Sequence, residues 1–178
     1  MMMCEHRNRV GDMGELAFAL NACERDWIVS RPISERQYYD YIVDNGRDRL
    51  RVQVKSTEIL SRRNHYRVNL GHGGRTRVPY TKAEIDFFAI YVVPDDTWYI
   101  FSVEEAAGRL GMSIPRYARI RGTVFERYLE NWAAMGREIQ KTELCPGSPH
   151  CSLKRHVRRK PTLDIHACAS EFETQPLR

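Results

Sequence analysis

The chain has 178 residues, apolar side chains at 42% of its positions and a net charge of +5. A chain of this length and composition can bury the core of one ordinary domain and still carry some trailing sequence. No run of about 18 apolar residues occurs, and the first residues lack the apolar stretch of a secretory signal. These features argue against a membrane protein and predict a soluble, cytoplasmic one. The five cysteines are odd in number and irregularly spaced, which favours free thiols in a reducing compartment.

The first half of the chain predicts one helix followed by strands. Residues 11–26 have helical spacing, with Asp12 as the N-cap and an apolar stripe that includes Met13, Leu16 and Leu20. Short strands are expected at residues 27–32, 38–44, 50–57 and 65–70. The second and third of these strands form a hairpin, because Asn45 and Gly46 between them are a strong turn signal.

The second half predicts a loop, two strands and two helices. Residues 71–79 form a glycine-rich connection without the Lys-Ser/Thr ending of a phosphate-binding loop, and residues 81–85 form one helical turn. Strands are expected at 86–94 and 97–102, a helix capped by Ser102 and Glu105 at 102–110, and an amphipathic helix from about Phe125 to Lys141. The order of these elements predicts one α/β domain over residues 1–141. Residues 142–178 have weak periodicity and a basic cluster, so we expect a disordered tail.

Positive charge is concentrated in the middle of the chain. Residues 47–77 contain nine basic and two acidic residues, a local net charge of 9 − 2 = +7. The basic residues are Arg47, Arg49, Arg51, Lys55, Arg62, Arg63, Arg67, Arg75 and Arg77. Such a field suits a polyanion, although a solvated Arg-rich hairpin would have the same composition.

Three polar features stand out within the apolar pattern. Glu15 lies on a second apolar face of the predicted helix, with Phe18 and Ala22, so we expect this helix to be packed on two sides. A carboxylate there is either buried at a cost or, near the helix start, favoured by the helix dipole. Asp40 lies in a strand, where Asp is disfavoured. In RVQVKS (residues 51–56), Gln53 and Lys55 alternate with valines, and the hairpin brings them near Asp40. For the isolated stretch, an antiparallel strand with one solvated face is the simpler interpretation.

Taken together, GELAFAL, YYDYIVD and RVQVKS resemble the PD-(D/E)xK nuclease superfamily, and more narrowly the group I intron-associated homing endonucleases. Archaeal Holliday-junction resolvases are wider relatives. The resemblance spans residues 11–102 and implies a restriction-endonuclease-like core, in which a central mixed β-sheet is flanked by helices.

The resemblance also implies the roles of individual residues. Glu15, Asp40, Gln53 and Lys55 would form the catalytic set, and Mg²⁺ would be held by Asp40, Glu15 and the main-chain carbonyl of Val54. Lys55 would orient or help to deprotonate the attacking water and offset phosphate charge. The predicted contacts to double-stranded DNA are Arg51, Arg62, Arg63, Arg67, Arg75 and Arg77.

Gln53 departs from the broad superfamily, which has Asp or Glu at this position, but resembles the intron-associated subgroup. A neutral amide can offer an oxygen to the metal but adds no negative charge, so Glu15 would matter more. Two alternatives stay open: a structure-selective Holliday-junction resolvase, and an inactive nucleic-acid-binding module with the same fold. Cutting both strands with one site per chain favours a homo-oligomer, a dimer or a tetramer.

Overall fold

The computed structural model describes residues 2–34, 37–61, 63–116 and 120–136, with only the backbone described for residues 2–8. The predicted tail, residues 142–178, lies outside the described residues. Within them, no helix is both long enough and apolar enough to cross a membrane.

A five-stranded mixed sheet forms the centre of the fold, in the order β1-β2-β3-β7-β8. The strands are β1 (Ile28–Ser30), β2 (Tyr41–Asp44), β3 (Arg49–Thr57), β7 (Phe87–Val92) and β8 (Thr97–Ser102). Only the β3–β7 pair is parallel, and the other three pairs are antiparallel. The β2–β3 hairpin was predicted from Asn45 and Gly46, and the asparagine side chain stabilises it by accepting hydrogen bonds from the backbone of Arg47 and Asp48.

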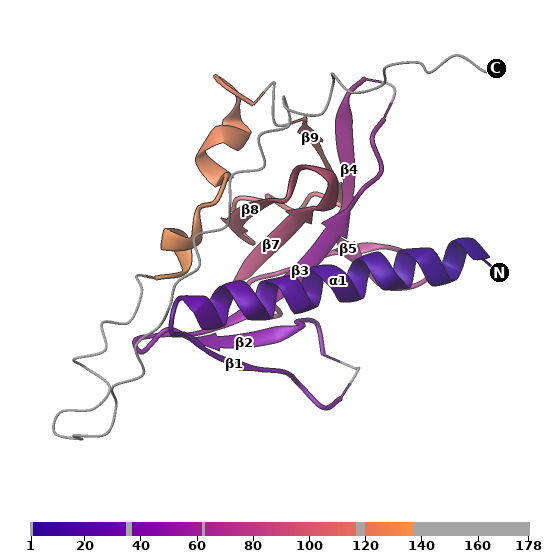
Figure 1. Ribbon diagram of the computed structural model, residues 1–178. Helices are drawn as coiled ribbons and strands as arrows, with labels where there is room; N and C mark the ends of the chain where they lie inside the picture. Colours follow the sequence, from indigo (N-terminus) through magenta and orange to yellow (C-terminus); the bar gives the residue numbers. More distant parts are fainter. Residues whose placement is uncertain (1, 35–36, 62, 117–119, 137–178) are drawn as a thin grey trace, which may run out of the picture. The chain divides into compact units, whose positions relative to one another are not determined.

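Helix α1 (Met2–Glu24) packs against β3 on one face of the sheet (Figure 1). Phe18 is fully buried there, stacked on Tyr41 and Trp132 and in edge contact with Trp98. Helix α1 starts well before the predicted Asp12 cap and continues through Gly11 and Gly14. Each glycine costs a helix interior about 1 kcal/mol, so tertiary packing has overridden local propensity here.

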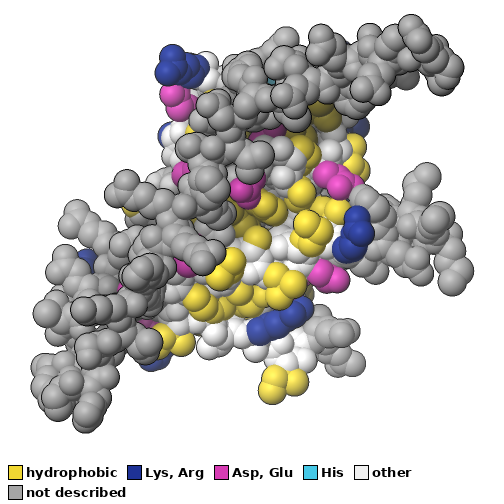
Figure 2. Space-filling view, in the orientation of Figure 1, with side chains coloured by type: hydrophobic (Ala, Val, Ile, Leu, Met, Phe, Trp, Pro, Cys, Tyr) yellow, Lys and Arg dark blue, Asp and Glu magenta, His cyan; other side chains and the backbone are white. Residues whose placement is uncertain are grey.

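The expectation that both apolar faces of α1 are packed was wrong. The predicted stripe is on the outside, where Met13 is 45% exposed, Leu16 66% and Leu20 60%. The face that meets the sheet carries Phe18 and Ala22 instead, both fully buried. Figure 2 shows hydrophobic side chains gathered on the face of the molecule that α1 crosses in Figure 1.

The opposite face of the sheet is covered by two small antiparallel pairs. Strands β4 (His65–Asn69) and β9 (Gly111–Pro115) form one two-stranded ribbon. Strands β5 (Gly71–His72) and β6 (Val78–Pro79) form the other, so the segment predicted as a loop is a short hairpin. Side chains from β4 and β9 join the buried cluster that also holds Phe88, Ile90 and Phe101.

Helices flank the sheet less than predicted, since α1 is the only α-helix among the described residues. The segment 102–110 makes the expected contacts between Ser102 and Glu105, but successive i→i+3 hydrogen bonds turn the chain and Ala107 and Gly108 adopt positive φ. The segment predicted as a long amphipathic helix contains two 3₁₀ helices, η3 (Val124–Tyr128) and η4 (Trp132–Met135).

Glu130 separates these two 3₁₀ helices. Its φ is +49°, its backbone N–H donates to the Trp98 carbonyl, and its carboxylate accepts from the Trp98 backbone and the Trp132 indole. These bonds attach the segment to the edge strand β8, and an α-helix could not make them. Trp132 and Met135 are nevertheless buried, as their spacing predicted.

Candidate active site

Asp40 lies immediately before β2 and is fixed to β3 by three hydrogen bonds. Its backbone N–H donates to the Val52 carbonyl, and its Oδ2 accepts from the Val54 backbone N–H at 2.7 Å and from Gln53 Nε2 at 2.5 Å. Both side-chain bonds fall on Oδ2, so Oδ1 keeps its lone pairs for another ligand. The hairpin therefore holds this carboxylate in one orientation.

Gln53 is buried, with only 6% of its surface exposed. A carboxylate oxygen only accepts hydrogen bonds, so the part of the Gln53 amide that faces Asp40 has to be its NH₂ group. The Gln53 amide oxygen accepts from the Tyr80 hydroxyl at 3.2 Å. Burial raises the pKa of Tyr80 well above the ordinary value, so this hydroxyl keeps its proton. Gln53 thus links Tyr80 to Asp40, and the solvated-face interpretation of RVQVKS was wrong.

Lys55 faces both carboxylates of the site. Its burial lowers the pKa of the ammonium, while the charges of Asp40 and Glu15 act in the opposite direction. The Nζ atom also lies 5.7 Å from the centre of the Tyr80 ring, within the range of a cation–π contact. The charges of Lys55 and the two carboxylates therefore interact, and the lysine also lies against the Tyr80 ring.

Glu15 enters the site from α1, where Gly14 brings the helix close to the sheet. A Cβ at Gly14 would lie 1.7 Å from Ser56 Oγ, so only glycine permits this approach beside Lys55. Burial raises the pKa of Glu15, and the charge of Asp40 raises it further, while Arg31 opposes the shift. The pKa of Asp40 is also raised, mainly by burial. Two carboxylates with raised pKa values and one lysine thus share a single site.

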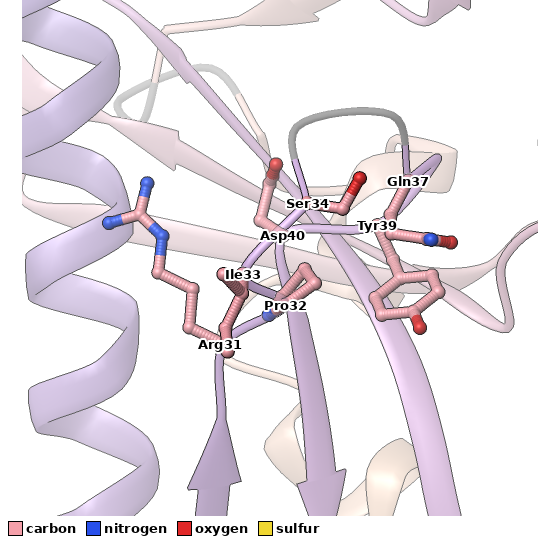
Figure 3. Close-up of a pocket in the computed structure, with 7 residues that line it drawn as sticks. All are labelled: Arg31, Pro32, Ile33, Ser34, Gln37, Tyr39 and Asp40. Atoms are coloured by element: carbon pink, nitrogen blue, oxygen red, sulfur yellow. The ribbon is translucent and has the colours of Figure 1, made fainter.

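A cavity of about 480 Å³ opens beside Asp40 (Figure 3). Its lining residues are Arg31, Pro32, Ile33, Ser34, Gln37, Tyr39 and Asp40. Figure 3 shows Arg31 reaching toward α1, where its Nη2 pairs with Glu15 Oε2 at 2.9 Å. Asp40 is therefore accessible from this cavity.

The atoms of the site that could bind a metal ion are all oxygens. No cluster of three His, Cys, Asp or Glu side chains occurs in the part of the chain that the structure describes. The donors available at the site are the Asp40 and Glu15 carboxylates and the Val54 carbonyl, which lies 3.2 Å from Gln53 Nε2. This set consists of hard oxygens, is short of a full coordination shell, and fits a cation such as Mg²⁺ that keeps several waters.

The arginines predicted to contact DNA fall into separate groups. The guanidinium of Arg51 binds the Asp86 carboxylate and the carbonyls of Lys82 and Ala83. This residue therefore links β3 to the segment that precedes β7. Four others are exposed, namely Arg63, Arg67, Arg75 and Arg77, whereas Arg62 lies outside the described residues.

Two residues of the site were not predicted from the sequence. Arg31 pairs with Glu15, and Tyr80 contacts both Gln53 and Lys55. Arg31 precedes a proline, and Tyr80 follows one at the end of the glycine-rich segment, and neither pattern marks an active site. Their roles depend on contacts between residues far apart in the chain.

A mixed sheet with an Asp immediately before one strand and a Lys on its neighbour is the arrangement of a restriction-endonuclease-like fold. The family model described as PD-(D/E)XK endonuclease matches residues 5–126, and the chain belongs to this family. Among solved structures, the chain is similar to a bacterial homing endonuclease, I-Ssp6803I, with a TM-score of 0.64 and 26% sequence identity. The match covers 72% of this chain and 91% of that one. A comparison with curated proteins found no match.

Proposed function

We propose that this endonuclease hydrolyses phosphodiester bonds of double-stranded DNA with the help of Mg²⁺ held by Asp40, Glu15 and the Val54 carbonyl. The observation that carries the proposal is the grouping of Asp40, Glu15 and Lys55, whose charges interact, with Asp40 lining an open cavity. Carboxylates that repel each other in a partly buried site favour a cation between them. A bound divalent cation neutralises charge on the phosphoryl oxygens and lowers the pKa of an attacking water.

Lys55 acts on the attacking water and on the phosphate in this proposal. Burial lowers the pKa of Lys55, so a larger fraction of its amine is unprotonated near neutral pH and available to accept a proton than in an ordinary lysine. When protonated, the same group places fixed positive charge where the reaction develops negative charge. The Tyr80 ring and the two carboxylates restrict its position.

Gln53 positions Asp40 and does not bind the metal through its amide oxygen, because that oxygen is directed at Tyr80. Its NH₂ group donates to Asp40 Oδ2, which leaves Oδ1 for the metal. This role explains how the site tolerates a neutral residue where the broad superfamily has an acid. The carboxylate of Glu15 then supplies the second negative charge.

The exposed arginines Arg63, Arg67, Arg75 and Arg77 supply the contacts to the DNA. In the described part of the chain, no ion pair holds any of these four guanidinium groups, in contrast to Arg49 and Arg51. Each neutralised phosphate releases condensed counterions, so binding weakens as the salt concentration rises.

We also propose that the exposed face of α1 binds a second copy of this chain, which gives the homo-oligomer needed to cut two strands. Met13, Leu16 and Leu20 form its apolar centre, with Arg9 one turn before and Glu24 one turn after. An antiparallel two-fold pairing that places Met13 opposite Leu20 also places Arg9 of one copy opposite Glu24 of the other. The charges and the apolar positions are therefore self-complementary, as a two-fold interface requires.

Cleavage of plasmid DNA tests the nuclease proposal. With Mg²⁺, Asp40→Ala and Lys55→Ala should each lower the cleavage rate by about 100-fold or more while DNA binding persists. Asp44→Asn is the matched control, because Asp44 flanks the turn of the same strand and pairs with Arg49, and it should cut at the wild-type rate. If wild type and variants bind DNA but are equally inert, the chain is a binding module. Faster cleavage of four-way junctions than of linear duplexes would identify a resolvase.

Light scattering after size exclusion tests the interface. Leu16→Glu should convert the wild-type dimer to a monomer, and Leu110→Glu, the same change at an exposed leucine outside α1, should not. A monomeric wild type, or a Leu16→Glu variant that remains dimeric, would contradict the assignment of this face.

A further inference from the structure

The β4–β9 ribbon presents one buried face and one polar face. Tyr66 and Val68 of β4, with Met112 and Ile114 of β9, point into the core and hold the ribbon in place. The alternate residues face outward, apart from Pro115, which is buried, and the register pairs His65 with Pro115, Arg67 with Ser113 and Asn69 with Gly111. Long polar side chains on one strand thus face small residues on the other.

This arrangement leaves a second cavity, of about 440 Å³, on the outward face of the ribbon. It is lined by Ser61, Arg63, His65, Arg67 and Ser113. The lining carries several hydrogen-bond donors and no acidic side chain, which suits a ligand rich in acceptors. No ion pair within the described residues engages the guanidinium of Arg67.

The backbone of the ribbon is attached to the strand that carries Lys55. Thr57 Oγ1, at the end of β3, donates to the Arg67 carbonyl at 3.0 Å, and the Arg67 N–H donates to the Ile59 carbonyl. A group bound on the outward face is therefore held in a fixed relation to the catalytic strand (Figure 1).

The hydrogen-bonding character of His65 is also fixed. Its Nδ1 lies 2.7 Å from the Arg63 carbonyl oxygen, which only accepts, so Nδ1 carries the proton. In the neutral ring, Nε2 is then an acceptor. Arg67 provides only donors, and the Ser113 hydroxyl can do either. The Asn69 side-chain oxygen accepts from the Gly71 N–H, so this residue terminates the outward face instead of extending it.

We infer that the outward face of this ribbon reads base edges in the major groove of B-form DNA, with Arg67 and His65 as the residues that determine specificity. The inference rests on the proposed function and adds the element that selects the sequence. The major groove admits a two-stranded ribbon, Arg is suited to the two acceptors of guanine, and an acceptor such as His65 Nε2 is suited to an amino group of adenine or cytosine. The narrow major groove of A-form RNA would not admit the ribbon.

The spacing of His65 and Arg67 along β4 predicts how far apart the two recognised base pairs lie. Residues two apart on a strand are about 6.8 Å apart, which equals about two base-pair steps of 3.4 Å. Guanine recognition by Arg67 and amino-group recognition by His65 should therefore fall about two base pairs apart. Arg75 and Arg77, in the β5–β6 hairpin, would contact only the phosphate backbone, which carries no direct sequence information.

Selection from a randomised duplex library in EDTA, where cleavage is blocked, tests the inference. Wild type should enrich a site with a guanine at one position and a second preference about two base pairs away. Arg67→Ala should lose the guanine preference by about tenfold to 100-fold, Arg67→Lys should retain part of it, and His65→Ala should lose only the second preference. Arg75→Ala, the matched control, should weaken binding to all sequences and keep both preferences. Melting temperatures would verify that each variant is folded.

The outcomes separate the two proposals. If Arg67→Ala and His65→Ala weaken binding to all DNA sequences equally and the base preferences persist, the ribbon contacts only the DNA backbone and the inference is overturned. It is also overturned if wild type binds duplex DNA without any preference, although the nuclease proposal would then stand. Failure of wild type to bind duplex DNA at all would contradict the proposed function itself.

Discussion

Replacing Gln53 by Glu tests the role of this residue most sharply, because the change restores the acid of the broad superfamily with almost no change of shape. In the structure, Gln53 donates a hydrogen bond to Asp40 from a buried position. An ionised carboxylate there would face the Asp40 carboxylate at hydrogen-bond distance. The variant can keep the bond only if one of the two carboxyls holds a proton.

The cost of that proton sets the expected magnitude. Each pH unit above the ordinary carboxyl pKa of about 4.3 costs about 1.4 kcal/mol, so protonation at pH 8 costs about 5 kcal/mol. We therefore expect Gln53→Glu to lower the free energy of unfolding by about 3–5 kcal/mol at pH 8 without metal. A buried carboxyl with a raised pKa destabilises the fold above that pKa and does so less as the pH falls. At pH 6 the loss should shrink to about 2 kcal/mol.

Urea denaturation in EDTA at pH 8, 7 and 6 measures this effect. Asn69→Asp is the matched control, since the same amide-to-acid change at an exposed residue should alter stability by no more than about 0.5 kcal/mol. Millimolar Mg²⁺ should recover more stability in Gln53→Glu than in wild type, because a cation compensates the facing carboxylates. The reasoning would be refuted by a variant as stable as wild type at pH 8, or by a deficit that grows as the pH falls.

Further predictions concern the neighbours of Gln53. Tyr80→Phe leaves the Gln53 amide oxygen buried without its donor and should lower the free energy of unfolding by about 1–3 kcal/mol in urea; equal stability would argue against this contact. Mg²⁺ at 100 times its Kd should stabilise wild type by about 2.7 kcal/mol and Asp40→Asn by far less, as thermal melts would show; equal stabilisation would place the metal elsewhere. Protons compete with the metal for Glu15 and Asp40, whose pKa values are raised from 4.5 and 3.8. Titration calorimetry should therefore find that metal affinity begins to fall at a pH above the ordinary pKa values of these two carboxyls. A metal affinity that stays constant down to pH 5 would contradict the raised pKa values.

The hairpin that carries Asp40, Gln53 and Lys55 could be predicted from the sequence because its signals are local. An Asn-Gly turn fixes the hairpin, and the alternation of Val52 and Val54 with polar residues fixes the faces of β3. The polarity of an isolated strand, however, did not reveal that Gln53 is buried. Gln53 is buried because Tyr80 and the strands β4, β5 and β6 cover the second face of the sheet.

The packing of α1 could not be predicted from periodicity, since two of its faces are apolar. The size of the side chains determines which face packs on the sheet. Gly14 and Ala22 allow the helix to approach the sheet closely, whereas Leu16 and Leu20 would keep it at a larger distance. The segment after β8 was predicted incorrectly for a different reason. Helical spacing around Trp132 correctly predicts burial, but the hydrogen bonds of Glu130 to β8 replace the α-helix with two short 3₁₀ turns.

The most direct measurement is a crystal structure with Mn²⁺ in place of Mg²⁺, in which anomalous scattering locates the metal without reference to activity. The proposed function predicts a peak bound by Asp40 Oδ1 and the Val54 carbonyl oxygen at roughly 2.0–2.6 Å, with Glu15 binding the metal or one of its waters. Arg31 should then have left the Glu15 carboxylate that it now contacts. A peak elsewhere, or no peak at a Mn²⁺ concentration that supports cleavage, would contradict the assignment of this site.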